Sequence, residues 1–208
     1  MLIISSYEQS YNPITSIFTV ITDEILCCPL CGGILLYLDS KPRGLKNLAG
    51  LVSRFLLRRL RCSACGKIHT ELPDIIQPYK HYDSETIQHV LDGSAGASYC
   101  AADDSTMRRW KSSFAESAAD ISQRLTSIRA RISDEKIPIQ KSEEILNLIR
   151  GEEKHWLAFV MALLINSGHK LHTRFAFCPA EFSVKVNVKI KTEAEGGQKI
   201  DKTFDDSS

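Results

Sequence analysis

Four cysteines near the start of the chain are spaced as metal ligands. Cys28-Pro-Leu-Cys31 and Cys62-Ser-Ala-Cys65 are each a CxxC pair followed by glycine, and thirty residues separate the pairs. Two intervening residues let both sulfurs of one turn reach the same ion, and the glycine relieves crowding where amide groups turn back toward sulfur. The pattern predicts one structural Zn²⁺ held by Cys28, Cys31, Cys62 and Cys65.

Two disulfides, or four ordinary buried thiols, are the alternatives to this metal site. The segment from Met1 to Ser16 has neither the basic start nor the apolar stretch of a signal peptide. We therefore expect a cytoplasmic protein with reduced thiols, in which paired CxxC motifs bind metal. If Cys27 replaced Cys28 as a ligand, three residues would separate the first pair of cysteines, and their spacing would no longer match that of the second pair. His69, four residues after Cys65, could act as a substitute ligand, cap the turn or contact a partner.

The other reactive residues of the sequence are not spaced as a second metal site or as a catalytic site. A second metal site from His169, His172 and Cys178 lacks a matching spacing and a fourth ligand. The chain also lacks a carboxylate trio spaced for strand transfer and a phosphate loop, because Gly93-Ser-Ala-Gly96 is not followed by Lys-Ser/Thr. We therefore expect no enzymatic activity.

Charge and hydropathy indicate a protein with a local basic surface and no membrane span. The 208 residues carry a formal net charge of +1, yet residues 40–70 hold eight basic side chains and no acidic one. This block predicts a phosphate-binding surface, with a solvated strand and loop as the alternative. The longest apolar run, 156–165, is too short to cross a bilayer.

The order of elements predicts an α+β fold: a small amino-terminal zinc ribbon of short strands, then a mainly helical region with a helix-turn-helix. A strand is expected within 14–25, and a short helix or loop at 48–56 before a strand that enters the second CxxC. Helices are expected from Asp83 or Ser84, at 98–102, from Asp104 or Ser105 to 114, and over 118–133, 142–149 and 152–166; 182–190 alternates as a strand or tail. The corresponding domain boundaries are 1–78, 79–117, 118–180 and 181–208.

The third of these helices carries arginines beside a tryptophan. In a helix-turn-helix, Trp110 would be buried against the other helices while Arg108, Arg109 and Lys111 approach the major groove. The alternative is a core tryptophan with arginines on a solvent-exposed face. The predicted DNA-binding residues are Arg54, Arg58, Arg59, Arg61, Lys67, Ser105, Arg108, Arg109 and Lys111.

The set of motifs resembles a bacterial family of uncharacterised zinc-ribbon proteins that look like the amino-terminal DNA-binding parts of insertion-sequence transposases. The resemblance rests on the first CxxC-Gly-Gly, on residues 60–73, on Asp103 to Trp110, and on Asn166-Ser-Gly with His172-Thr-Arg174. It implies zinc on the four cysteines, a helix-turn-helix around Arg108 and Arg109, and a mobile-element setting.

The sequence as a whole favours a zinc-stabilised, non-enzymatic DNA-binding protein, either a mobile-element accessory factor or a transcriptional regulator. The expected partners are DNA and the recombination proteins of a mobile element, with no membrane. Two alternatives stay open: a protein-interaction scaffold that does not bind DNA, and a transposase- or recombinase-related protein.

Overall fold

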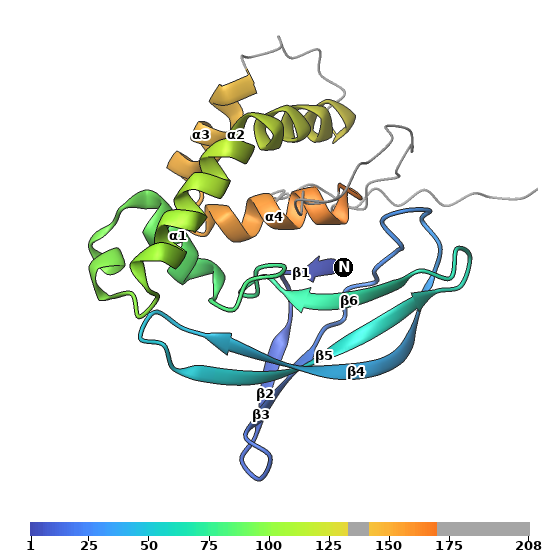
Figure 1. The fold of residues 1–208 in the computed structure, drawn as a ribbon. Helices are drawn as coiled ribbons and strands as arrows, with labels where there is room; N and C mark the ends of the chain where they lie inside the picture. The colour runs from blue at the N-terminus through green and yellow to red at the C-terminus, as the bar shows by residue number, and fades with distance from the viewer. Residues whose placement is uncertain (133–141, 170–208) are drawn as a thin grey trace, which may run out of the picture.

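A computed structural model describes residues 1–132 and 142–169 and has an amino-terminal sheet followed by helices (Figure 1). The α+β class is thus confirmed. The strands are β1 (Leu2–Ile4), β2 (Glu8–Asn12), β3 (Ile17–Ile21), β4 (Leu35–Lys46), β5 (Val52–Cys62) and β6 (Ile68–Pro73). The helices are α1 (Ser84–Asp92), the short 3₁₀ helix η1 (Ala95–Tyr99), α2 (Asp104–Ile132), α3 (Ser142–Glu152) and α4 (Trp156–Asn166).

Strand β5 organises the sheet. Antiparallel β4 pairs with it along nearly its whole length, while parallel β3 and antiparallel β6 share its other edge. The helix or loop predicted for 48–56 was therefore wrong over most of that range. Strands β4 and β5 are longer than predicted, with 12 and 11 residues, whereas the other strands are short as expected. Apolar residues at 48, 51, 52, 55 and 56 fit a helical period, but Phe55 and Leu57 alternate with more exposed neighbours in the strand.

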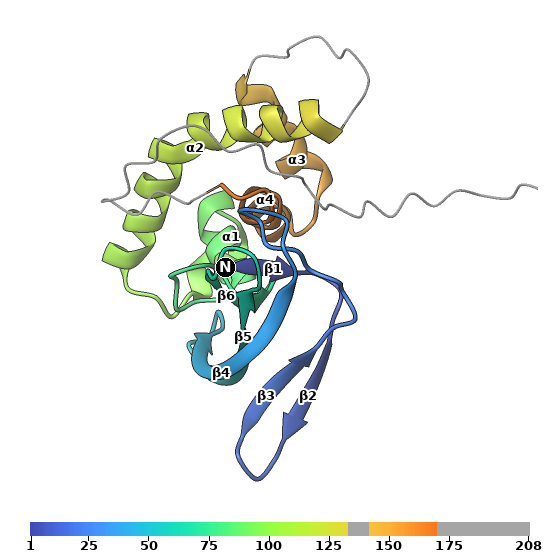
Figure 2. The same cartoon turned by 90° about the vertical axis from the view of Figure 1, so that its right-hand side faces the viewer.

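The main core lies between the sheet and the helices. Buried β1 runs parallel to β6, and α4 packs over β1 (Figure 1). Ile4 and Leu72 from these strands are fully buried, as is Val160 of α4. The hairpin β2–β3 extends away from the helices (Figure 2). The position of β1 under α4 explains why all three of its residues are apolar.

Helix α1 begins and ends where the sequence indicated. The Asp83 side chain accepts a hydrogen bond from Thr86 N, and Gly93 closes the helix with a φ of 62°. The next predicted helix, 98–102, is instead the 3₁₀ helix η1 at Ala95–Tyr99. Its single turn replaces the second helix on which the helix-turn-helix expectation depended, and that motif is not shown.

Helix α2 is one continuous helix that contains the two helices predicted for this region, so only the predicted break between residues 114 and 118 was wrong. It begins at Asp104, and its capping carboxylate belongs to Asp103, which accepts a hydrogen bond from Thr106 N at 2.8 Å. Trp110 is buried, as expected. Its ring packs in an edge-to-face contact with the ring of Tyr82, and the ring centroids are 5.2 Å apart. This contact joins α2 to the segment between β6 and α1.

The last two helices occupy the region of the predicted pair, but α3 continues through Gly151 to Glu152, and α4 begins at Trp156 rather than at residue 152. Across residues 1–132 and 142–169, no helix combines the length and apolar character that crossing a bilayer requires. The predicted segment 182–190 and the residues His172, Arg174 and Cys178 lie outside the described residues.

Candidate metal centre and basic surface

The two CxxC turns adopt the same backbone conformation. In the first, Cys28 N donates to Gly33 O and Gly32 N donates to Cys28 O, both at 2.8 Å. In the second, Cys62 N donates to Lys67 O at 2.9 Å. The first turn leads into β4, and the second connects β5 to β6. Because β4 and β6 flank β5, the sheet brings the two turns together.

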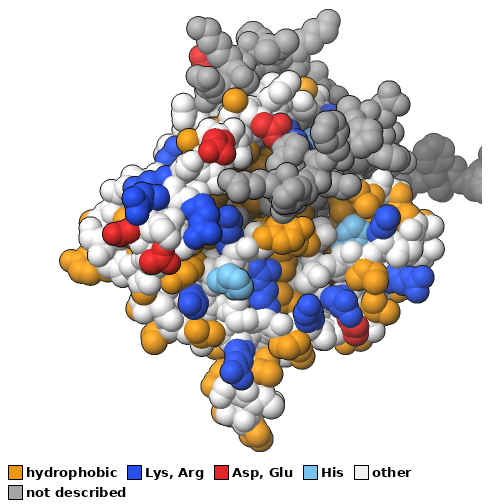
Figure 3. All heavy atoms as spheres, in the orientation of Figure 1, with side chains coloured by type: hydrophobic (Ala, Val, Ile, Leu, Met, Phe, Trp, Pro, Cys, Tyr) orange, Lys and Arg blue, Asp and Glu red, His pale blue; other side chains and the backbone are white. Residues whose placement is uncertain are grey.

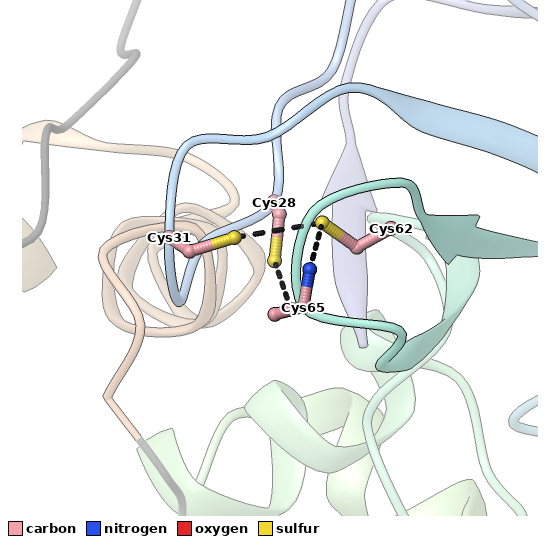
Figure 4. A group of neighbouring side chains, drawn as sticks. All are labelled: Cys28, Cys31, Cys62 and Cys65. Atoms are coloured by element: carbon pink, nitrogen blue, oxygen red, sulfur yellow. Dashed lines mark hydrogen bonds between the residues drawn. The ribbon is translucent and has the colours of Figure 1, made fainter.

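The four cysteine sulfurs converge between these turns (Figure 4). All four Sγ atoms lie within 4.8 Å of one another. Sγ of Cys28 lies 3.7 Å from that of Cys65, and Sγ of Cys31 lies 3.5 Å from that of Cys62. A tetrahedral thiolate site with Zn–S bonds of about 2.3 Å has S···S edges of about 3.8 Å. The arrangement fits a structural metal site and brings together the four cysteines that the sequence predicted.

Glycines permit the close approach of the two turns. Gly32 and Gly66 follow the second cysteine of each turn and have φ values of 72° and 69°, a conformation that favours glycine. Gly33 is required for a different reason. A Cβ atom there would lie 2.9 Å from Sγ of Cys62 and 2.9 Å from Cβ of Ala64.

Without a cation, the four thiols do not ionise alike. The backbone N–H of Cys65 lowers the pKa of Cys62 to about 6, whereas burial raises the pKa of Cys28. The pKa of Cys31 is raised to about 12: the N–H of Gly33 lowers it, but the adjacent thiols outweigh this effect. Four close sulfurs cannot all carry negative charge unless a cation is present, so metal binding and proton release are coupled here.

His69 contacts the centre without joining the four sulfurs. It is 4 % exposed, and its Nε2 lies 3.3 Å from Sγ of Cys28. Burial lowers the pKa of His69 to about 4, so the ring is neutral at pH 7 and one of its nitrogens can donate to the thiolate. Cys27 forms a backbone bridge with Ile34 and is not part of the sulfur group.

Two of the predicted DNA-binding arginines are engaged within the protein. The guanidinium of Arg58 donates to both carboxylate oxygens of Glu71 at 2.9 Å. Arg59 makes the equivalent two-pronged contact with Asp39. These acids lie immediately outside the acid-free block 40–70. Pairing across neighbouring strands therefore neutralises two of the eight cations in the block.

The other predicted residues of the sheet remain available to solvent. Arg54, Arg61 and Lys67 are exposed, and none of them takes part in an ion pair within the described residues. Figure 3 shows lysine and arginine side chains spread over the sheet and the adjoining helices on one face. The block is therefore a surface of partly unpaired positive charge.

The predicted residues of α2 do not share one face. Arg108 and Lys111 line a shallow groove with α1 and η1, whereas Arg109 lies on another flank, close enough to Lys80 to lower its pKa. The exposed Ser105 donates its hydroxyl to Asp103. Lys80 was missed because it stands outside the basic block, and sequence spacing gave no sign that it meets α2.

Residues 28–110 match DUF6431, a family described as a domain of unknown function. The matched range runs from the first cysteine of the sulfur group to Trp110 on α2, and so includes all four clustered cysteines. Neither the curated proteins nor the solved structures gave a match to the chain. The resemblance to transposase DNA-binding parts and the helix-turn-helix therefore stay predictions.

Proposed function

We propose that this chain is a zinc-stabilised, non-enzymatic protein that binds DNA through its curved sheet and the start of α2. The observation that carries the proposal is the charge of the β4–β6 region. Only two of the eight cations in 40–70 have carboxylate partners in the described residues, namely Arg58 and Arg59. Exposed arginine and lysine side chains without carboxylate partners are what a phosphate backbone attracts.

In this proposal Zn²⁺ fixes the sheet that carries the charges. Cysteine thiolates in a tetrahedral set of four are typical zinc ligands, and a structural ion supplies folding free energy directly. Elemental analysis of the purified protein should give one zinc per chain. Cys62→Ser should abolish this stoichiometry, while the matched control Cys27→Ser should retain it. A zinc-free wild-type protein with intact fold would contradict the proposed metal.

DNA binding is tested by fluorescence anisotropy with random duplex DNA over a range of salt concentrations. If about six phosphates are neutralised, the slope of log K against log salt should be near −5. Phosphate contacts made by Arg54, Arg61 and Lys67 should each contribute about one unit to that slope. A flat salt response would exclude the sheet as a phosphate-binding surface.

The biological setting that we propose is a mobile-element accessory factor or a transcriptional regulator. The resemblance to transposase amino-terminal parts supports the first role. An adjacent transposase or recombinase gene would favour the accessory role. Absence of catalysis is tested by incubating the protein with Mg²⁺ and supercoiled plasmid. Nicking that copurifies with the protein would instead identify it as a transposase- or recombinase-related enzyme.

A protein-interaction scaffold is the second candidate, favoured by an apolar row beside the metal centre. Leu36 on β4 and Ile68 on β6 lie on either side of Arg61, and both are more than half exposed. Exposed apolar side chains around an arginine are typical of protein interfaces. Light scattering distinguishes the two candidates, because a scaffold of this kind should self-associate without DNA.

A further inference from the structure

The turn between β6 and α1 has a conformation that its sequence does not favour. Lys80 N donates to Gln77 O at 3.2 Å, which closes a four-residue turn with Pro78 and Tyr79 at its centre. Tyr79 has a φ of 60°, where glycine or asparagine would normally stand in a turn of this kind. Tyr79 is 64 % exposed. The ring therefore contributes little packing to offset the unfavourable backbone conformation.

The sheet holds this turn in place. The guanidinium of Arg43, on β4, donates to Gln77 O at 2.8 Å and to Lys80 O at 2.7 Å. One residue past the turn, His81 O accepts from Lys46 N at 2.7 Å. The side-chain nitrogen of Lys46 lies 5.5 Å from the centre of the Tyr82 ring. Two cations of the basic block are thus placed against the turn.

Helix α2 brings a further cation to the same place. Tyr82 contacts Trp110 of α2, the residue next to Arg109. Burial is the larger cause that lowers the pKa of Lys80, and the positive charge of Arg109 lowers it further, so the two cations lie within electrostatic reach of each other. Burial raises the pKa of Tyr82, with a smaller contribution from the carboxylate of Asp103. That carboxylate already accepts hydrogen bonds from Ser105 and Thr106.

We propose that Lys46, Lys80 and Arg109 hold a phosphate of a DNA strand, and that Tyr79 stacks on an unpaired base of the adjoining nucleotide. Clustered cations with an adjacent exposed ring are the two components of single-strand recognition. The proposal explains why tyrosine occupies a position where glycine would relieve the backbone. It rests on the proposed DNA-binding function and adds a specific nucleotide site to it.

The test compares two labelled duplexes by anisotropy, one blunt and one with a single-stranded overhang. The wild-type protein should bind the overhang duplex more tightly. Tyr79→Gly should lose about fivefold or more in affinity for the overhang duplex while binding the blunt duplex as the wild type does. Its melting temperature should equal or exceed that of the wild type, because glycine accepts the positive φ.

Lys80→Gln should weaken binding to both duplexes and reduce the salt slope by about 0.9. Lys154→Gln, an exposed lysine between α3 and α4, is the matched control and should change neither. Inorganic phosphate should displace DNA no better than chloride at equal ionic strength. Stronger displacement would assign the cluster to free phosphate and overturn the proposal.

The outcomes distinguish failure of the nucleotide site from failure of the proposed DNA binding. If the wild type binds both duplexes equally, or if Tyr79→Gly keeps the overhang preference or loses thermal stability, the nucleotide site is overturned while DNA binding stands. If the wild type binds neither duplex at low salt, the proposed function fails together with the site.

Discussion

The carboxamide of Asn166 pairs with both backbone polar groups of Ile3. Ile3 N donates to Oδ1 at 2.9 Å, and Nδ2 donates to Ile3 O at 2.7 Å. The last residue of α4 thus acts as one more strand partner for β1, on the side away from β6. Because β1 has only three residues, this side chain fixes the strand to the helical layer.

Asn166→Ala should therefore destabilise the protein by about 1–3 kcal/mol, since it leaves a donor and an acceptor of buried Ile3 without partners. Urea denaturation measures the difference in the free energy of unfolding. Asn147→Ala, an exposed asparagine on α3, is the matched control and should change the free energy by less than about 0.5 kcal/mol. Equal effects of the two variants would contradict the pairing role.

Two arginines on β5, Arg58 and Arg61, should differ in how much their replacement lowers the free energy of unfolding. Arg58→Met leaves the carboxylate of Glu71, which is 3 % exposed, without its two-pronged partner. Because the Arg58 side chain is itself 37 % exposed, water compensates in part, and we expect a loss of about 2 kcal/mol. Chemical denaturation tests this value.

Arg61→Met is the matched control on the same strand. Arg61 is exposed and forms no ion pair within the described residues, so stability should change by less than about 0.5 kcal/mol. Its loss should reduce the salt slope of DNA binding instead. If Arg58→Met were as stable as the wild type but bound DNA weakly, Arg58 would contact DNA rather than stabilise the fold through Glu71.

The cysteine cluster and helix α1 could be predicted because their signals are local. Within each CxxC pair the cysteines are three residues apart, and Asp83 caps α1 within the span of a single turn. The strands were harder to predict because pairing joins distant residues. Nothing in the apolar spacing of 48–56 reveals that β4 lies alongside β5, and only that pairing decides against a helix.

Which charges the arginines meet also depends on contacts between residues that are far apart in the sequence. Arg59 and its partner Asp39 are twenty residues apart in sequence. Lys80 comes within electrostatic reach of Arg109 in the fold that also places Tyr82 against Trp110. The continuity of α2 was open to prediction, however. Its apolar stripe passes from Phe114 to Ala118 without a helix breaker between them.

Asp103 should make stability depend on pH in the acidic range. Hydrogen bonds from the Ser105 hydroxyl and from Thr106 lower its pKa from 3.8 to about 2. A carboxyl whose pKa is lower in the folded state stabilises the protein above its unfolded pKa. This contribution is complete above pH 3.8 and is lost as the pH falls toward 2.

Asp103→Ala should consequently unfold at lower urea concentration than the wild type at pH 7, and the gap should narrow below pH 3.8. Asp104→Ala, one residue later and also exposed, should show a smaller change at pH 7 because Thr106 donates its hydrogen bonds to Asp103 instead. A constant gap between Asp103→Ala and the wild type would show that the ionised carboxylate is not the capping group.

Alanine should weaken zinc binding at one glycine, Gly33, and stabilise the fold at another, Gly151. At Gly33 a Cβ would meet Cys62 Sγ at 2.9 Å, and the metal ligands would have to separate. Gly33→Ala should therefore weaken zinc affinity by about tenfold or more, measured by competition with a chromophoric chelator. Gly151 lies within α3, and apart from its chain neighbours and the adjacent backbone of the helix, no atom of the described residues lies within 4 Å of the position of its Cβ. Gly151→Ala should raise the free energy of unfolding by about 0.5–1 kcal/mol and leave zinc affinity unchanged. Wild-type zinc affinity in Gly33→Ala would mean that the two turns do not approach as closely as the sulfur distances require.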